Sequence, residues 1–319
     1  MAFKFPGPPR RPNVTVATNT CPPRPRNRAK KPRNPHSLAA VRLRPSRAAP
    51  AMEFFPDGMH LRLRNRKHGT YLHADEDGVY VSLTLHRASL NTAWQVHRVL
   101  RSGGDYVLLH SAAYGRYLAL SPEQVSLVYV GHRAVQGVYE SPEQDDVLWE
   151  AVWVDDEGGD VLMLHASNRL LRAAPWNPLL NSCVFVDIDN AGAMMHWVVE
   201  AIPLRPEPPP LPAVTPLPIG VVLWRKIVYM RADDHGNFDP LARRTYDFSG
   251  RSLNQLTGDL ANQLREPFHR ITLCVRAGSH GRLTPLAIDL PSNQQAMEII
   301  VLTTMSPEVI GFVYNDPCY

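Results

Sequence analysis

One pattern occurs three times in the first two-thirds of the chain, and it restricts the possible folds more than any other feature. The first copy occupies residues 61–94, and its opening returns at residues 107–119 and 162–173. Each copy runs on to a tryptophan, at Trp94, Trp149 and Trp197. The tryptophans are 55 and 48 residues apart, so each unit is close to 50 residues long. Such a chain requires a fold with three equivalent parts.

Aligned positions of the three copies predict the same turn and the same buried side chains in each. The turn position is Gly69, Gly115 or Asn168, and glycine and asparagine accept a positive φ at least cost. Two residues later stand Tyr71, Tyr117 and Leu170, followed by Leu72, Leu118 and Leu171. We expect these large side chains and the three tryptophans to pack in the core.

Alternating polarity predicts that each copy is made of short strands. Leu61 and Leu63 alternate with Arg62 and Arg64, which is typical of a strand with one buried face. Turn-forming clusters separate such runs, and residues 52–202 show no apolar helical stripe. Three four-stranded units are too few for a propeller. They can close a small barrel that hairpins cap at one end, so we predict a mainly β fold and a β-trefoil for residues 52–202.

The basic residues are concentrated at the N-terminus. Residues 1–51 hold twelve Lys and Arg, eleven prolines and no Asp or Glu, which predicts a disordered basic tail. Residues 52–202 hold 11 basic and 19 acidic residues, a net charge of −8. We therefore expect nucleic-acid binding only through the tail. No stretch approaches the roughly 18 apolar residues of a membrane span, so we expect no membrane partner.

Three interpretations of the tail stay open. It could be an organellar transit segment, a nuclear or nucleic-acid-binding segment through residues 24–33, or an extension that precedes a start at Met52. The four cysteines show no C-x-x-C spacing, which favours reduced thiols. We expect a cytoplasmic location, or a nuclear or plastid one if the tail is a targeting segment.

The rest of the chain predicts a linker and a second domain. Residues 203–218 contain eight prolines in sixteen, typical of a semi-rigid spacer. Ser252 and Gln255 have the spacing of a capping box, and a leucine stripe follows at Leu253, Leu256, Leu260 and Leu264. We predict strands at residues 221–231, 244–248, 271–277, 286–290 and 298–303. This order predicts a small α+β domain of the β-grasp type for residues 219–319.

Four stretches carry a resemblance to known proteins: Met52-Glu-Phe-Phe, residues 63–75, the closing Trp-x-Val, and Tyr246-Asp-Phe-x-Gly-Arg-Ser. Together they resemble a plant family of unknown function. The repeat domain of that family is classed as fascin-like, or actin cross-linking, and a ubiquitin-like segment often follows it. The resemblance implies a β-trefoil, a β-grasp domain and the role of an interaction or scaffold protein associated with filamentous actin.

A basic cluster occurs in the first copy alone and is the expected partner-binding site. It consists of Arg62, Arg64, Arg66 and Lys67. Arg62 and Arg64 share one face of the predicted strand, and the other two follow in the loop. Filamentous actin is acidic, so these four residues are where we expect it to bind. One trefoil offers one filament site, and cross-linking would need a dimer or a second site; the sequence leaves the oligomeric state open.

Two other classes of function have less support. Sugar-binding trefoils of the ricin type carry Gln-x-Trp in each repeat, and this motif is missing three times. Binding of a carbohydrate or another small molecule is the alternative function. No nucleophile elbow, zinc-protease motif, P-loop or dinucleotide-binding motif is present. The trio Asp233-Asp-His235 is the most catalytic-looking, but neighbouring residues in a turn rarely converge. We expect no enzymatic activity, no metal and no cofactor.

Overall fold

The computed structural model describes residues 51–102, 104–124, 131–154, 159–174, 183–188, 192–205, 207–212, 223–312 and 314–316. All of them belong to one compact unit, residues 44–319. The expected tail lies outside the described residues except for Ala51, and so does the linker at residue 206 and from residue 213 onward. Within these ranges, no helix has the length and apolar character to cross a membrane.

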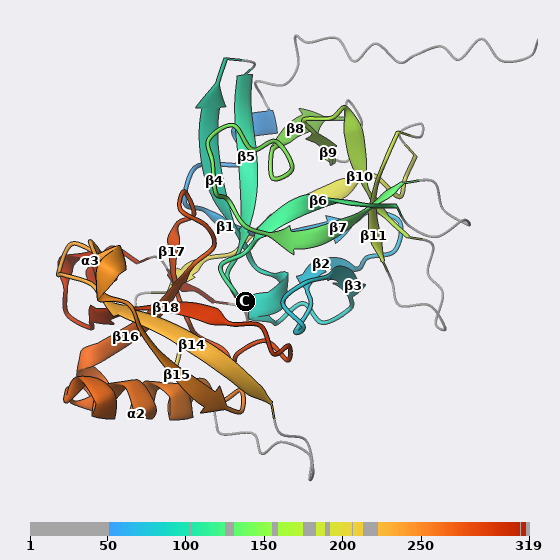
Figure 1. The fold of residues 1–319 in the computed structure, drawn as a ribbon. Coiled ribbons are helices and arrows are strands. Elements are labelled where there is room, and N and C mark those ends of the chain that lie inside the picture. The colour runs from blue at the N-terminus through green and yellow to red at the C-terminus, as the bar shows by residue number, and fades with distance from the viewer. Residues whose placement is uncertain are drawn as a thin grey trace, which may run out of the picture. The chain divides into compact units, whose positions relative to one another are not determined.

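Six strands of the repeat region form a closed barrel (Figure 1). They are β1 (His60–Asn65), β4 (Trp94–Arg101), β5 (Gly104–Ser111), β8 (Trp149–Trp153), β9 (Val161–His165) and β12 (Trp197–Ala201). Each pairs antiparallel with the next, and β12 returns to β1. Closure leaves no free edge in this ring.

Three hairpins complete this domain, one from each sequence repeat. They are β2 (Tyr71–Ala74) with β3 (Val81–Thr84), β6 (Tyr117–Gln124) with β7 (His132–Gly137), and β10 (Arg169–Ala173) with β11 (Val184–Asp187). A short 3-10 turn, η2 (Leu90–Thr92), precedes β4. A six-stranded barrel with three hairpins is a β-trefoil, as the repeat predicted.

The three tryptophans begin β4, β8 and β12 and are completely buried. Each indole Nε1 donates a hydrogen bond to the carbonyl of the aligned leucine of its own repeat. The acceptors are Leu72, Leu118 and Leu171, at 3.1, 2.9 and 3.1 Å. A buried donor without a partner would be costly, so this bond explains how tryptophan fits the core of every repeat.

The predicted turns adopt the predicted backbone. Gly69, Gly115 and Asn168 have φ of 66°, 68° and 60°. This left-handed region excludes most other residues because of their Cβ atoms. The prediction from the aligned sequence is therefore confirmed.

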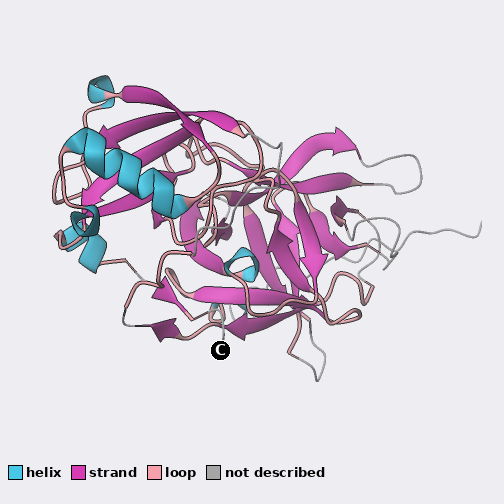
Figure 2. Ribbon diagram, turned by 90° about the horizontal axis from the view of Figure 1, so that it is seen from below, coloured by secondary structure: helices cyan, strands magenta, loops and turns pink. Residues whose placement is uncertain are grey.

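The C-terminal domain is a five-stranded sheet with the order β15-β14-β18-β16-β17. The strands are β14 (Trp224–Arg231), β15 (Arg244–Ser249), β16 (Ile271–Arg276), β17 (Leu283–Pro285) and β18 (Met297–Thr303). The first and last of these, β14 and β18, are parallel neighbours in the middle of the sheet. Helix α2 (Leu253–Leu264) covers one face (Figure 2). This arrangement is a β-grasp, or ubiquitin-like, fold.

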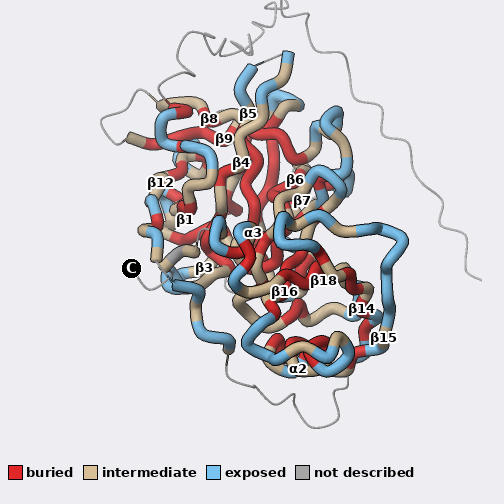
Figure 3. Tube along the Cα trace, turned by 90° about the vertical axis from the view of Figure 1, so that its left-hand side faces the viewer, coloured by how far each residue is buried: buried red, intermediate tan, exposed pale blue. Residues whose placement is uncertain are grey.

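Helix α2 begins where its sequence predicts. The Ser252 hydroxyl accepts a hydrogen bond from the Gln255 amide at 3.3 Å, which caps the helix. The leucine stripe faces the sheet: Leu253, Leu256 and Leu260 are buried and Leu264 is half-buried. Figure 3 shows the buried side of the helix turned toward the strands and its outer side in contact with solvent.

The predicted strand at residues 286–290 is wrong. The strand lies earlier, at Leu283–Pro285, and the chain then leaves the sheet for the start of α2. There the Leu290 amide bonds to the Arg251 carbonyl at 2.8 Å, and Asp289 accepts from the Leu253 amide at 3.0 Å. Leu286 and Leu290 are buried, so packing of an irregular segment produces an alternation that resembles a strand.

Short elements surround the sheet: η3 (Pro240–Ala242), η4 (Phe268–Arg270) and α3 (Pro307–Ile310). After α3 the chain forms β19 (Tyr314–Asn315), which pairs antiparallel with β13 (Leu204–Arg205). Strand β13 follows the last barrel strand. The beginning and the end of the C-terminal segment are therefore held together by one small ladder.

The two domains meet through paired polar groups. The Arg282 guanidinium forms an ion pair with both oxygens of Asp57, at 2.7 and 2.8 Å. The Arg282 amide donates to the Tyr117 hydroxyl at 3.0 Å. A charged pair with two bonds fixes orientation as well as distance. Together they hold the β16–β17 loop against the trefoil.

Candidate functional site

The predicted basic cluster does not form one surface. Arg62 has no exposed area, whereas the prediction placed it on a solvent-facing strand face that a partner could reach. Burial lowers the pKa of Arg62, while the carboxylates of Glu200 and Asp316 oppose this shift. Asp316 directly follows β19, so this segment places a negative charge near Arg62. The alternating sequence had predicted that this face of β1 is in contact with solvent.

Ion pairs neutralise most of the remaining cluster. Arg64 contacts Glu200 at 2.7 Å, and Arg66 lies 3.6 Å from the nearly buried carboxylate of Asp160. Among the described residues, no carboxylate pairs with Lys67. The positive charge expected to attract actin is therefore largely compensated within the trefoil. The sequence did not indicate this because Glu200 and Asp160 are distant along the chain.

A groove on the ubiquitin-like domain has a mainly apolar lining. It has a volume of about 720 Å³. Its rim carries four exposed apolar side chains: Leu211, Phe268, Met305 and Ile310. Large apolar side chains that gather around one depression are typical of interaction surfaces.

Five separate segments build this groove. The buried residues Leu253, Leu273 and Leu286 form its floor. Pro208 and Pro209 of the linker form one wall, so the linker shapes the site as well as joining the domains.

Local sequence signals fix the positions of the rim residues. Phe268 opens η4 directly after Pro267. Met305 precedes Ser306, the N-cap of α3, and Ile310 is the last residue of this helix, which begins with Pro307. Proline has no amide hydrogen and suits this first position. The short helix thus holds two large apolar side chains outward.

Few polar groups in the groove are available to a ligand. The Thr257 hydroxyl already donates to the Leu253 carbonyl at 2.8 Å, and the Thr272 and Thr304 hydroxyls lie 3.2 Å apart. Such a site favours an apolar occupant over a polar one. The sequence analysis missed it because its residues are far apart. One local signal was present in the sequence: the large apolar residues Met305 and Ile310 lie close to Ser306, a residue typical of a helix N-cap.

Side chains with catalytic potential are used in structural roles. Asp233 accepts hydrogen bonds from the amides of His235 and Asn237, at 2.9 and 2.8 Å. The amide hydrogen bond from Asn237 is the main cause that lowers the pKa of Asp233. The trio therefore forms a turn. Cys274 is a buried thiol of β16, and burial raises its pKa, which opposes formation of the reactive thiolate.

Within the described ranges, no group of three His, Cys, Asp or Glu side chains is arranged to hold a metal ion.

Two family models match the chain. Residues 52–200 match the family described as a beta-trefoil domain of unknown function, DUF569. Residues 223–302 match the DUF569 associated ubiquitin-like domain. The two matches follow the order of the two folds, and they agree with the resemblance noted in the sequence.

Solved structures similar to the chain include several trefoils. A designed threefold-symmetric protein, ThreeFoil, is 19% identical, with a TM-score of 0.36 over 44% of this chain and 97% of its own. The SDF2-like protein from Arabidopsis thaliana is 11% identical, with a TM-score of 0.38 over 45% and 92%. The Rhizoctonia solani agglutinin is 17% identical, with a TM-score of 0.37 over 46% and 96%. Similarities this low support no inference about function.

A comparison with curated proteins finds no match.

Proposed function

The chain belongs to the DUF569 family, with both the β-trefoil and the associated ubiquitin-like domain, and we propose that this member is a non-enzymatic interaction protein. The groove of the ubiquitin-like domain binds an apolar segment of a partner protein. The trefoil serves as the rigid body that presents this domain.

One observation carries the proposal: four large apolar side chains lie exposed around a single groove. Met305 and Ile310 are 77% and 68% exposed, although both are strongly apolar. Burying such side chains against a partner removes apolar area from water, which is the main driving force of protein association. Since the lining of the groove is mainly apolar and its three threonine hydroxyls are already paired, the partner segment should supply apolar side chains and few charges.

Actin is not part of this proposal. The resemblance implied an actin-associated scaffold, and the sequence pointed to Arg62, Arg64, Arg66 and Lys67. One of these is buried and two are ion-paired. We therefore place the partner-binding surface on the other domain. The plant origin and the cytoplasmic location remain predictions.

The carbohydrate alternative receives no support from the trefoil tryptophans. The repeat tryptophans Trp94, Trp149 and Trp197 are completely buried, and their indole nitrogens bond to backbone carbonyls. They cannot stack on a sugar ring.

The test compares two variants that carry the same chemical change. Met305→Glu with Ile310→Glu places charges in the groove. Leu241→Glu is the control, because Leu241 is 92% exposed in the same domain but does not line the groove. Partners captured by the wild-type protein are purified, and their binding to each variant is measured by calorimetry.

We expect Leu241→Glu to bind like the wild type and the double variant to lose at least about tenfold in affinity, which equals about 1.4 kcal/mol. Equal affinity of all three proteins would refute the groove as the binding site.

A further inference from the structure

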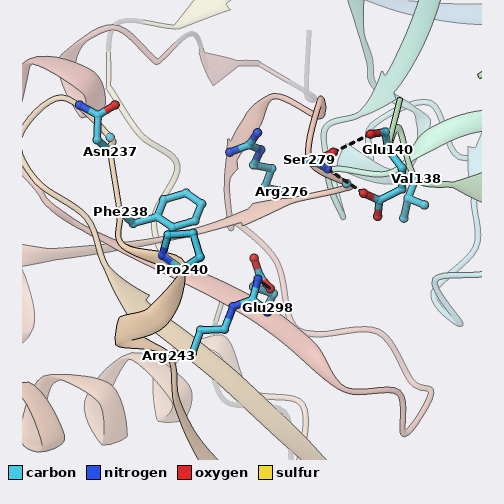
Figure 4. Close-up of a pocket in the computed structure, with 11 residues that line it drawn as sticks. Val138, Glu140, Asn237, Phe238, Pro240, Arg243, Arg276, Ser279 and Glu298 are labelled. Carbon is cyan, nitrogen blue, oxygen red and sulfur yellow. Dashed lines mark hydrogen bonds and ion pairs between the residues drawn. The ribbon is translucent and has the colours of Figure 1, made fainter. Parts of the chain in front are cut away.

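A second cavity, of about 630 Å³, lies between the two domains (Figure 4). The trefoil contributes Val138 and Glu140 to its lining. The ubiquitin-like domain contributes Phe238, Arg243, Arg276 and Glu298, among others. None of its lining residues belongs to the apolar groove, so it is a separate site.

Backbone contacts make one wall of this cavity rigid. The Ser279 hydroxyl donates to the Glu140 carbonyl at 2.6 Å, and the His280 amide donates to the Tyr139 carbonyl at 3.0 Å. Gly278 has a φ of 89°, and a Cβ there would lie 2.3 Å from the Tyr139 oxygen. Only glycine allows the loop to approach so closely. These contacts hold residues 278–280 against the trefoil and define this wall of the cavity.

The charges that line the cavity are unevenly paired. Arg243 and Glu298 form an ion pair at 3.3 Å. A carboxylate oxygen of Glu140 accepts a hydrogen bond from the Ser279 amide at 3.0 Å. The side chain of Arg276 makes no hydrogen bond or ion pair with any described residue, and its Nε is buried without an acceptor. Its guanidinium lies over the Phe238 ring, 5.8 Å from the centroid.

The guanidinium of Arg276 could bind an anion, and none of the described residues supplies one. A guanidinium presents several N–H donors in a planar fork that matches a carboxylate. Leaving a buried donor unpaired costs free energy. Figure 4 shows Arg276 between Phe238 on one side and Ser279 and Glu140 on the other.

We propose that this cavity binds a small organic carboxylate with an apolar body. Arg276 pairs with the carboxylate, and Phe238, Pro240 and Val138 contact the apolar part. A phosphate ester fits less well, because its second negative charge would lie near Glu140 and Glu298. The site therefore selects a monoanion.

Phenylacetate is a suitable probe, since it combines one carboxylate with an aromatic ring. It is titrated into the full chain up to about 10 mM and followed by amide shifts in NMR spectra. We expect saturable shifts near residues 138–140, 237–243 and 276–279, and none near Met305 and Ile310. Neutral 2-phenylethanol and inorganic phosphate should each bind at least about tenfold more weakly.

Arg276→Gln should reduce phenylacetate affinity at least about tenfold, because it removes the charge and the fork. Arg270→Gln is the matched control, since Arg270 is an exposed arginine of the same domain outside both sites. Phe238→Leu is a second variant that keeps the charge, and it should weaken phenylacetate more than acetate.

Three results would overturn the proposal: no shifts in the wild-type protein, phosphate binding as tight as that of phenylacetate, or unchanged affinity in Arg276→Gln. If Arg276→Gln does not fold, the decision passes to Phe238→Leu, and equal effects on phenylacetate and acetate would count against the site. Loss of protein partners through the groove would leave each of these readouts unchanged.

Discussion

The hydroxyl of Thr284 and Nε2 of His110 lie 2.9 Å apart, buried between the ubiquitin-like domain and the trefoil. Both side chains are almost inaccessible to solvent. Beside them, His97 Nδ1 lies 3.0 Å from the Tyr117 hydroxyl. Buried polar groups are tolerated when each has a partner. The Thr284–His110 contact joins the two domains, and so does the Arg282 amide that donates to the Tyr117 hydroxyl at 3.0 Å, whereas the His97–Tyr117 contact lies within the trefoil.

Thr284→Val tests this dependence. Valine keeps the shape of threonine but leaves His110 without its hydroxyl partner, so we expect a loss of about 1–3 kcal/mol in the free energy of unfolding. Urea denaturation followed by tryptophan fluorescence measures it. Thr245→Val is the control, because Thr245 is exposed on β15, and it should change stability by less than about 0.5 kcal/mol. Equal effects of the two substitutions would show that the pair does not join the domains.

Stability should depend on pH through the same junction. Burial, followed by the nearby positive charge of Arg282, lowers the pKa of His97 from 6.5 to about 4. Burial also lowers the pKa of His110 from 6.5 to about 3. The folded protein then binds protons more weakly than the unfolded chain. Stability is therefore complete above pH 6.5 and falls progressively as the pH decreases through 6.5 toward 4.

Unfolding free energies measured between pH 7.5 and 4.5 check this direction. His97→Gln should reduce the slope, and His235→Gln, at an exposed turn, should leave it unchanged. Stability that rises on acidification would contradict the expected sign.

Gly69 and Gly115 form a matched pair for a third experiment. Their φ values are 66° and 68°, but a Cβ on Gly69 would meet nothing within 4 Å, whereas one on Gly115 would lie 2.8 Å from Val275 Cγ2. Gly69→Ala should cost about 1–2 kcal/mol from backbone strain alone. Gly115→Ala should cost at least about 1 kcal/mol more, since it also pushes against the ubiquitin-like domain. Thermal and urea unfolding give both values, and equal losses would argue against close contact at Gly115.

Actin co-sedimentation tests the role implied by the family resemblance. Because the basic cluster is largely compensated, we expect the wild-type protein to stay in the supernatant at physiological salt. Arg66→Gln with Lys67→Gln should leave the pelleted fraction unchanged. Pelleting of the wild type that this double variant abolishes would restore the trefoil surface as the actin site. Arg62 is unsuitable for this experiment, since its substitution would act on stability.

The sequence predicted those features that depend on local rules and on internal repetition. The positive φ of Asn168 and of the two aligned glycines follows from residue type and repetition. The cap at Ser252 depends only on the next turn of the helix. The exposure of Arg62 could not be predicted in this way. Alternation correctly showed that Arg62 and Leu63 point in opposite directions. Whether the outer side meets solvent depends on segments more than 100 residues away, which no local pattern describes.

The groove and the cavity between the domains lie beyond sequence reasoning for a related reason. Each combines side chains whose proximity follows from the sheet order and from the docking of the domains. Phe238 and Arg276 are unremarkable in the sequence, and neither belongs to a motif. The structure brings both residues to one cavity with Glu140, and it shows that the Arg276 side chain has no ion-pair partner among the described residues.

The small β13–β19 ladder has a topological consequence. Because Leu204 pairs with Asn315 and Arg205 with Tyr314, the ubiquitin-like domain is an insertion between two paired strands and not a terminal appendage. A single proteolytic cut between residues 212 and 223 would sever the covalent path but leave both fragments attached. The assembly would then behave as a nicked protein, in which strand pairing replaces chain continuity.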